Sequence, residues 1–108
     1  DMIISGGFNI FPYEIEQVLD SHKAVYESCV LGVPDNLWGE AVKAVVVLRK
    51  NYQVGKQELI EYCGKHLAGF KKPRSIDFVD SLPRNPNGKV ARRIIREQFW
   101  HSEKRRVH

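Results

Sequence analysis

The segment Ala41-Val42-Lys43-Ala44-Val45-Val46-Val47-Leu48 decides the fold class of this 108-residue chain. It is a nearly continuous apolar run, which is typical of a strand that is buried on both faces of a sheet. A second strand is expected just before it, over residues 25–33. The apolar residues that would share one face of that second strand are Val25, Cys29, Leu31 and Val33.

A short loop, residues 34–39, joins these two strands and contains Trp38. A tryptophan in a short connection is most often tucked back onto the core of its own domain. We therefore favour a packing role for Trp38. The alternative is a position along a ligand path or at an interface.

The first twenty residues predict a β-hairpin followed by a helix. Two short apolar runs, Met2-Ile3-Ile4 and Phe8-Asn9-Ile10, flank Gly6-Gly7, a pair that favours a tight turn. Because glycine has no side chain, these two residues would also let a ligand approach the backbone closely. Pro12 suits the first position of a helix, which should end near Ser21-His22.

Downstream of the central strand, the pattern predicts a helix, a strand, a loop and a final helix. The second helix should span residues 56–67 and end at Gly69. An exposed link, residues 70–73, should lead to a third strand over 75–79. The last helix should span about 90–99, with Ile94, Ile95 and Phe99 packed inward. These elements predict a small α+β domain, with an N-terminal β-hairpin and a mixed sheet of about three strands flanked by helices.

Composition sets the broad class of the protein. The hydrophobic content of 43% supports one core and argues against disorder. No apolar run is long enough to span a membrane, so no transmembrane segment is expected. Cys29 and Cys63 stand in different predicted elements, which favours reduced thiols in a cytoplasmic protein; peripheral membrane association is left open. The four histidines show no metal-ligand spacing, and no metal site is expected.

Basic residues are concentrated in two clusters, within a formal net charge of +4. One cluster surrounds Pro73 and the other occupies the last 17 residues. Nucleic-acid binding is disfavoured, because the aromatic residues that interleave with basic ones in single-strand binders are largely missing. The side chains expected to be solvated, or to pair with a partner domain, are Arg92, Arg93 and Arg96.

The segment Leu82-Pro83-Arg84-Asn85-Pro86-Asn87-Gly88-Lys89 predicts a stiff loop with a lysine at its tip. Both prolines fix φ and lack an N–H, and Asn87-Gly88 favours a turn. An ammonium presented in this way can reach a phosphate or carboxylate that arrives from outside the domain. An ordinary surface turn that ends in lysine is the plainer alternative. A Walker A loop is excluded, because Val90 follows Lys89 where Ser or Thr is required.

Several segments together resemble the C-terminal domain of adenylate-forming enzymes, the superfamily of acyl-CoA synthetases, peptide-synthetase adenylation domains and luciferases. The segments occur in the family's order, and they are Asp1–Glu16, Gly32–Asp35 with Trp38-Gly39-Glu40, Phe70–Pro73 and Leu82–Lys89. The resemblance implies that residues 1–100 are a C-terminal lid domain. Residues 101–108 match nothing in the family and are expected to be a basic tail.

The resemblance also implies a two-step reaction. A carboxylic acid and ATP would form an acyl-adenylate and pyrophosphate, and coenzyme A would then take the acyl group and release AMP. A large N-terminal domain of the same enzyme would hold the acid and ATP with Mg²⁺. The small domain would swing between two orientations and present a different face for each step. The chain alone would be an inactive part of an acid–thiol ligase.

The resemblance assigns site residues to two faces. Lys89 would be the adenylation lysine, which stabilises charge that develops at the α-phosphate. The residues that would border the pantetheine tunnel or meet the coenzyme A nucleotide are Gly6, Gly7, Trp38, Phe70, Lys71 and Lys72. Phe8 departs from the glutamate or arginine that the family more often has there.

A fatty acid–CoA ligase is the whole enzyme that we expect from this chain. The alternatives are an aryl acid–CoA ligase, a peptide-synthetase adenylation domain, and a non-catalytic basic binding module. The pocket for the acid would lie in the N-terminal domain, so this sequence does not identify the acid.

Overall fold

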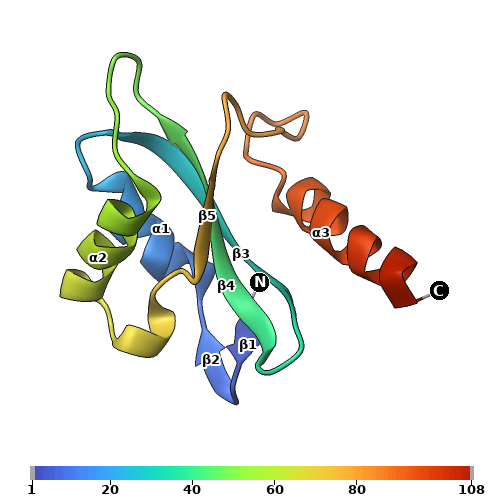
Figure 1. Cartoon of the computed structure of the whole chain (residues 1–108). Coiled ribbons are helices and arrows are strands. Elements are labelled where there is room, and N and C mark those ends of the chain that lie inside the picture. The colour runs from blue at the N-terminus through green and yellow to red at the C-terminus, as the bar shows by residue number, and fades with distance from the viewer. Residues whose placement is uncertain (1, 108) are drawn as a thin grey trace.

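The computed structural model describes the backbone of residues 2–107 and the side chains of residues 2–101. Within this part of the chain, three α-helices and a short 3-10 helix accompany a five-stranded sheet (Figure 1). The elements in chain order are β1 (Ile3–Ser5), β2 (Phe8–Ile10), α1 (Pro12–Asp20), β3 (Val25–Asp35), β4 (Gly39–Leu48), α2 (Lys56–His66), η1 (Gly69–Lys71), β5 (Ser75–Phe78) and α3 (Arg92–Val107). The predicted α+β class is confirmed.

Strand β4 is the centre of the sheet, as its apolar sequence predicts. It pairs with β3 in antiparallel fashion along its whole length, from Gly39 to Leu48, and with β5 in parallel. The first hairpin joins the same sheet, because Ser5 of β1 pairs with Gly39 of β4. The hairpin thus extends the expected three-stranded sheet to five strands.

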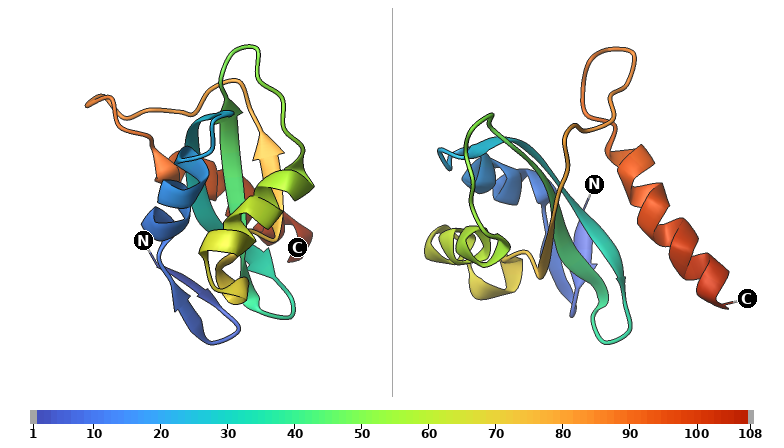
Figure 2. Two further views of the ribbon diagram at one scale, coloured as in Figure 1. Left: turned by 90° about the vertical axis from the view of Figure 1, so that its left-hand side faces the viewer. Right: turned by 45° about the horizontal axis from the view of Figure 1, so that its top comes forward.

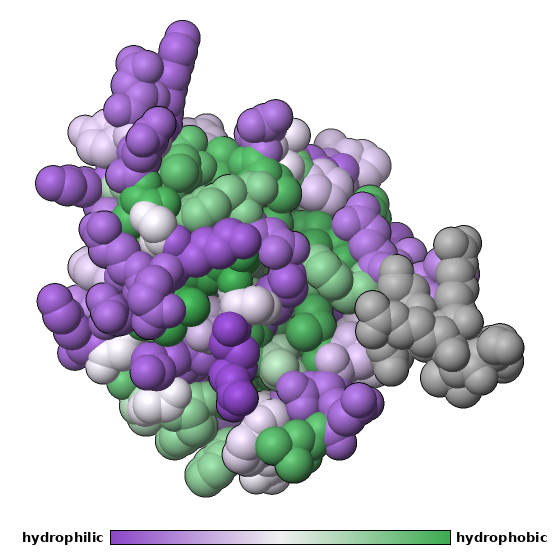
Figure 3. All heavy atoms as spheres, in the orientation of Figure 1, coloured by the Kyte–Doolittle hydropathy of each residue, from purple (hydrophilic) through white to green (hydrophobic). Residues whose placement is uncertain are grey.

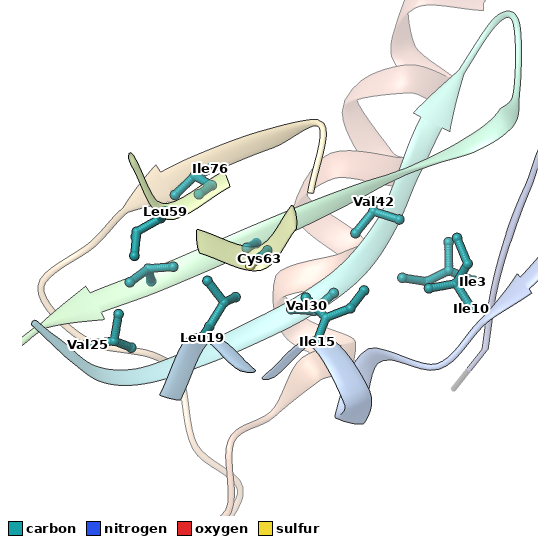
Figure 4. Close-up of a cluster of buried hydrophobic side chains, with 12 residues drawn as sticks. Ile3, Ile10, Ile15, Leu19, Val25, Val30, Val42, Leu59, Cys63 and Ile76 are labelled. Carbon is teal, nitrogen blue, oxygen red and sulfur yellow. The ribbon is translucent and has the colours of Figure 1, made fainter. Parts of the chain in front are cut away.

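The two faces of the sheet carry separate hydrophobic clusters. Helices α1 and α2 cover one face, and α3 lies on the other (Figure 2). The cluster under α1 and α2 contains Ile3, Ile10, Ile15, Leu19, Val25, Val30, Val42, Ala44, Val46, Leu59, Cys63 and Ile76 (Figure 4). The cluster under α3 contains Cys29, Leu31, Val45, Val47, Leu82 and Ile95. Alternate residues of β3 and β4 therefore serve opposite faces.

Two expected side-chain positions are wrong. Val25 does not share the face of Cys29, because the register of β3 against β4 shifts between Val25 and Glu27. A bulge of this kind moves the residues before it to the other face. Ile94 was expected to pack inward, but its side chain is 38% exposed, and Ile95 alone of this pair is in the core.

Three helix boundaries also differ from the predictions. Helix α2 ends at His66, because Leu67 is already extended, and Gly69 instead begins η1. Helix α3 begins at Arg92, since Val90 is held in an isolated bridge with Arg84. It continues past Phe99 to Val107. The basic tail was predicted over residues 101–108, and the side chains of all but the first of these lie outside the described residues.

Candidate functional site

The lysine loop, which we define as residues 82–91, leaves the sheet at the upper right of Figure 1. Both of its ends are anchored, because the side chains of Leu82 and Ala91 are buried. The N–H of Ala91 donates to the carbonyl of Pro83 at 2.8 Å, which closes the base of the loop. The tip of the loop therefore projects from a fixed base.

The backbone of the tip is held by its own turn. The N–H of Gly88 donates to the carbonyl of Asn85 at 2.8 Å, and the N–H of Asn85 donates to the carbonyl of Lys89 at 2.8 Å. Gly88 has φ of +87°, a conformation that favours glycine. The side-chain oxygen of Asn87 accepts the N–H of Lys89 at 3.0 Å. These bonds define a tight turn, as the sequence predicts.

The side chain of Lys89 is exposed, and among the described residues its ammonium has no hydrogen-bond or ion-pair partner. A lysine ammonium is a compact charge at the end of a flexible stem, so the position of the turn sets which anions it can reach. The geometry thus fits a phosphate or carboxylate that approaches from outside the domain.

Arg84 is a member of this loop that sequence reasoning did not single out. Its Nη1 donates to the carbonyl of Gly88 at 3.0 Å, and its Nη2 pairs with Oε1 of Glu27 on β3. The partner lies 57 residues away in the chain, so no local motif could have indicated the contact. The presence of an arginine in the loop motif was the one feature of the sequence that could have drawn attention to Arg84.

The hairpin end lies at the opposite end of the sheet, at the bottom of Figure 1, and the views of Figure 2 agree. We define the hairpin end as Ser5, Gly6, Gly7, Phe8, Trp38, Phe70 and Arg74. In the space-filling view of Figure 3, hydrophobic side chains reach the surface at this lower edge. Its residues come from β1, β2, the β3–β4 loop, η1 and the link to β5.

The Gly6-Gly7 turn packs directly on Trp38. Both glycines have positive φ, +56° and +85°, which is the geometry of a type I′ hairpin turn. The N–H of Gly6 donates to the carbonyl of Trp38 at 2.9 Å, and a Cβ at Gly6 would lie 2.6 Å from the Trp38 ring. The indole is nevertheless 38% exposed. Trp38 thus packs on the turn and also lines a surface hollow, and its position along a ligand path stays a prediction.

That hollow has a volume of about 250 Å³. The residues that line it are Ser5, Phe8, Trp38, Val42, Gly69, Phe70 and Arg74. The rings of Phe8 and Phe70 are stacked with centroids 4.2 Å apart, and the guanidinium of Arg74 lies 5.4 Å from the centroid of the Trp38 ring. Aromatic faces beside a cation suit a ligand with an apolar chain and an anionic group. Ser5, Phe8 and Arg74 are residues that sequence reasoning did not assign to this site.

Lys71 and Lys72 do not line the hollow. The ammonium of Lys71 forms a bond of 2.9 Å with Glu14 of α1, and the stem of Lys72 lies against Gly64 of α2. Pro73 is buried and both lysines are half-buried, so Phe70 is the one residue of the expected exposed link, residues 70–73, that is exposed. Of the residues predicted for this face, the structure brings Gly6, Trp38 and Phe70 together.

Of the three arginines of α3 that were expected to be solvated, Arg92 differs from the expectation, whereas Arg93 and Arg96 are exposed. Arg92 is not outward, because its Nη2 donates to Glu16 at 2.6 Å and its Nε donates to the carbonyl of Val30 at 3.1 Å. Arg93 is solvated, with its side chain 81% exposed. Arg96 lies over the ring of Trp100, 4.4 Å from its centroid.

Neither cysteine is placed to act as a nucleophile. Cys29 and Cys63 are free and buried, and burial raises the pKa of each thiol to about 11, so both are unreactive near neutral pH. Within the part of the chain that the structure describes, no cluster of side chains could hold a metal ion. None of the helices described there is long and apolar enough to cross a membrane.

Comparisons with known proteins point to one family. The family model described as "AMP-binding enzyme C-terminal domain" matches residues 14–89. Long-chain-fatty-acid–CoA ligase FadD13 of Mycobacterium tuberculosis is 46% identical over 99 residues, which are 92% of this chain and 20% of that protein. Fatty acid–[acyl-carrier-protein] ligase ScoC of Streptomyces coeruleorubidus is 44% identical over 99% of this chain and 21% of its own length.

Solved structures agree in fold. A Mycobacterium tuberculosis fatty acyl CoA synthetase matches with a TM-score of 0.87 and 45% identity, over 94% of this chain and 20% of that one. Apo MatB from Rhodopseudomonas palustris matches with a TM-score of 0.88 and 43% identity, over 92% of this chain and 20% of that one. The chain therefore spans about a fifth of the relatives that it matches.

Proposed function

This chain belongs to the AMP-binding enzyme C-terminal domain family, and we propose that it is the mobile domain of an ATP-dependent fatty acid–CoA ligase. The names of FadD13 and of the fatty acyl CoA synthetase support a fatty acid–CoA ligase, and the name of ScoC supports a fatty acid with acyl-carrier protein as the acceptor. The length of the relatives supports a large N-terminal domain, which would bind the acid and ATP with Mg²⁺. An aryl acid ligase or a peptide-synthetase domain would differ mainly in that absent domain or in the thiol acceptor.

The proposal rests chiefly on the two chemically different surfaces at opposite ends of one sheet. A domain that acts in two steps needs a separate surface for each orientation. The lysine loop offers a cation on a fixed backbone, and the hairpin end offers bare backbone, aromatic rings and a hollow. Among the described residues, the lysine loop and the hairpin end do not lie on the same face.

In adenylation, the residues of the lysine loop fit the negative charge of ATP and of the acid. The Lys89 ammonium would contact the attacking carboxylate and the nucleotide, and would stabilise the charge that grows at the α-phosphate. Because the turn is already fixed by hydrogen bonds, little reorganisation is needed when the domain closes. Rotation of the domain would then withdraw the loop.

In thioester formation, the residues of the hairpin end fit coenzyme A. The bare backbone of Gly7, which has open space around it, would leave room for the thin pantetheine chain beside Trp38, and Gly6 would support the Trp38 ring on which it packs. Phe70 offers a ring on which the adenine can stack, and Arg74 offers a cation for phosphate. Lys71 and Lys72 would contact the coenzyme A phosphates only after Lys71 leaves Glu14 and Lys72 leaves α2. We therefore assign them a secondary role in binding coenzyme A.

Variants at the two ends of the intact enzyme test the proposal. Lys89→Ala should slow pyrophosphate release, whereas Gly7→Leu should slow the transfer of the acyl group from supplied acyl-adenylate to coenzyme A. Gly7→Ala is the matched control, because it shares the backbone strain at φ of +85° but not the bulk. If both variants slow the same step, the assignment of one surface to each step is wrong.

A further inference from the structure

We infer that Arg84 is a positioning residue for Lys89, which it serves by fixing the lysine loop to strand β3. The inference rests on the proposed function, since it takes Lys89 as the residue that acts in adenylation. It concerns a different group, the guanidinium, and a different effect, the placement of the lysine.

One guanidinium joins two structures that are distant in sequence. Its Nη1 donates to the carbonyl of Gly88 at 3.0 Å, and Gly88 directly precedes Lys89. Its Nη2 pairs with Oε1 of Glu27, near the start of β3. Because the guanidinium is a rigid planar fork, the Gly88 carbonyl is held at a set distance from the sheet.

Glu27 is well placed to serve as the anchor. It follows the bulge in β3 and lies two residues before Cys29, so it shares the sheet face on which Leu82 and α3 pack. Its side chain is only 20% exposed. The carboxylate that pairs with Arg84 therefore extends from a paired strand and is partly shielded from solvent.

The contact affects the tip of the loop more than the stability of the fold. The Arg84 side chain is 43% exposed, and ion pairs at such sites contribute little to stability. The ends of the loop are anchored separately by buried Leu82 and Ala91. Loss of Arg84 should therefore leave the fold intact and free the Gly88 carbonyl, so that the lysine reaches its anion from a wider range of positions.

The test uses the intact enzyme and measures the two half-reactions separately. Arg84→Met keeps an unbranched side chain but removes both bonds, and it should slow pyrophosphate release by roughly tenfold, since small misplacement of a reacting group costs this much or more. Acyl transfer from supplied acyl-adenylate should stay within about twofold. Arg84→Lys can reach Glu27 or Gly88 but lacks the fork, and its rate should lie between wild type and Arg84→Met.

A double variant separates positioning from a general structural role. Adding Arg84→Met to Lys89→Ala should slow adenylation no further than Lys89→Ala alone, because Arg84 acts through Lys89. Arg93→Met is the matched control: Arg93 also forms an exposed ion pair, with Glu97, but lies outside the loop, and neither step should change.

Three outcomes would overturn the inference: an equal loss in both half-reactions, additive losses in the double variant, or no loss in Arg84→Met. If instead Lys89→Ala itself leaves adenylation unchanged, then the proposed function fails, and the role of Arg84 fails with it. The two failures are thus distinguishable.

Discussion

The lysine loop and the hairpin end achieve rigidity in different ways. In the lysine loop, hydrogen bonds fix the backbone while the functional ammonium of Lys89 stays in solvent. At the hairpin end, packing supplies the rigidity: the Gly6 backbone lies on the Trp38 ring, and Phe8 stacks on Phe70. The difference follows from what each surface would bind. A charge must remain free to meet another charge, whereas a passage for a thin chain needs firm walls.

Removal of the lysine ammonium is the most severe way to break this comparison. In the intact enzyme, Lys89→Ala should slow adenylation by about 10²–10³-fold, because one preorganised charge contact is lost from the transition state. The thioester step should change little. Separate assays of pyrophosphate release and of thioester formation check this, with Lys50→Ala as a control for the loss of one exposed lysine elsewhere. Equal slowing of both steps would return Lys89 to the plain surface-turn interpretation.

Removal of an aromatic wall should have a smaller effect at the other end. Phe70→Ala deletes the ring that stacks on Phe8 and lines the hollow, so the KM for coenzyme A should rise by about tenfold. Adenylation should be unaffected. Tyr52→Ala is the control, because Tyr52 is 45% exposed and Phe70 is 44% exposed, but Tyr52 lies outside the hollow. An unchanged KM would remove Phe70 from the coenzyme A surface.

The two ends also differ in how far the sequence predicts them. The lysine loop is local: prolines, Asn87 and Gly88 determine its turn, so a short motif is sufficient. The hairpin end is assembled from five separate segments, and the sequence indicated only its glycines, Trp38 and Phe70 by resemblance. Nothing in the sequence indicated that Phe8 would cover Phe70.

Long-range polar pairs explain most of what could not be predicted. Arg84 with Glu27 and Lys71 with Glu14 are each separated by 57 residues. Apolar periodicity predicts elements and the buried stripe, but it does not state which charged groups meet once the elements pack. The face of Val25 was missed for another reason, because one bulge reverses the alternation and leaves no pattern in the sequence.

Glycine substitutions compare the rigidity of the two ends directly. Gly6 and Gly88 both have positive φ, so alanine at either position costs about 1–2 kcal/mol of backbone strain. Gly6→Ala must also displace Trp38, since its Cβ would lie 2.6 Å from the ring, whereas Gly88→Ala enters open space. Chemical denaturation of the domain should therefore show a larger loss of unfolding free energy for Gly6→Ala. Equal losses would mean that Trp38 moves aside without cost.

The smallest expected effect concerns pH. The turns at the two ends differ in the side chain that accepts their backbone N–H groups, and only one of these side chains titrates. In the turn that carries Trp38 of the hairpin end, Oδ1 of Asp35 accepts the N–H of Leu37 at 2.8 Å and that of Trp38 at 3.0 Å. The bonds from Trp38 and then Leu37 lower the pKa of Asp35 below its ordinary value of 3.8. In the lysine loop, the acceptor for the Lys89 N–H is the amide of Asn87, which does not titrate.

A lowered pKa in the folded state fixes the sign of the effect. The Asp35 carboxylate supports its turn fully above about pH 3.8, and this support is lost as the pH falls through the lower folded value. In an NMR titration of the domain, the amide signals of Leu37 and Trp38 should therefore shift with a midpoint below 3.8, while that of Lys89 should not follow them. Asp35→Asn keeps an acceptor and should abolish the shift. A Lys89 signal with the same midpoint would show that the two ends titrate together, as they would if acid loosened the whole sheet.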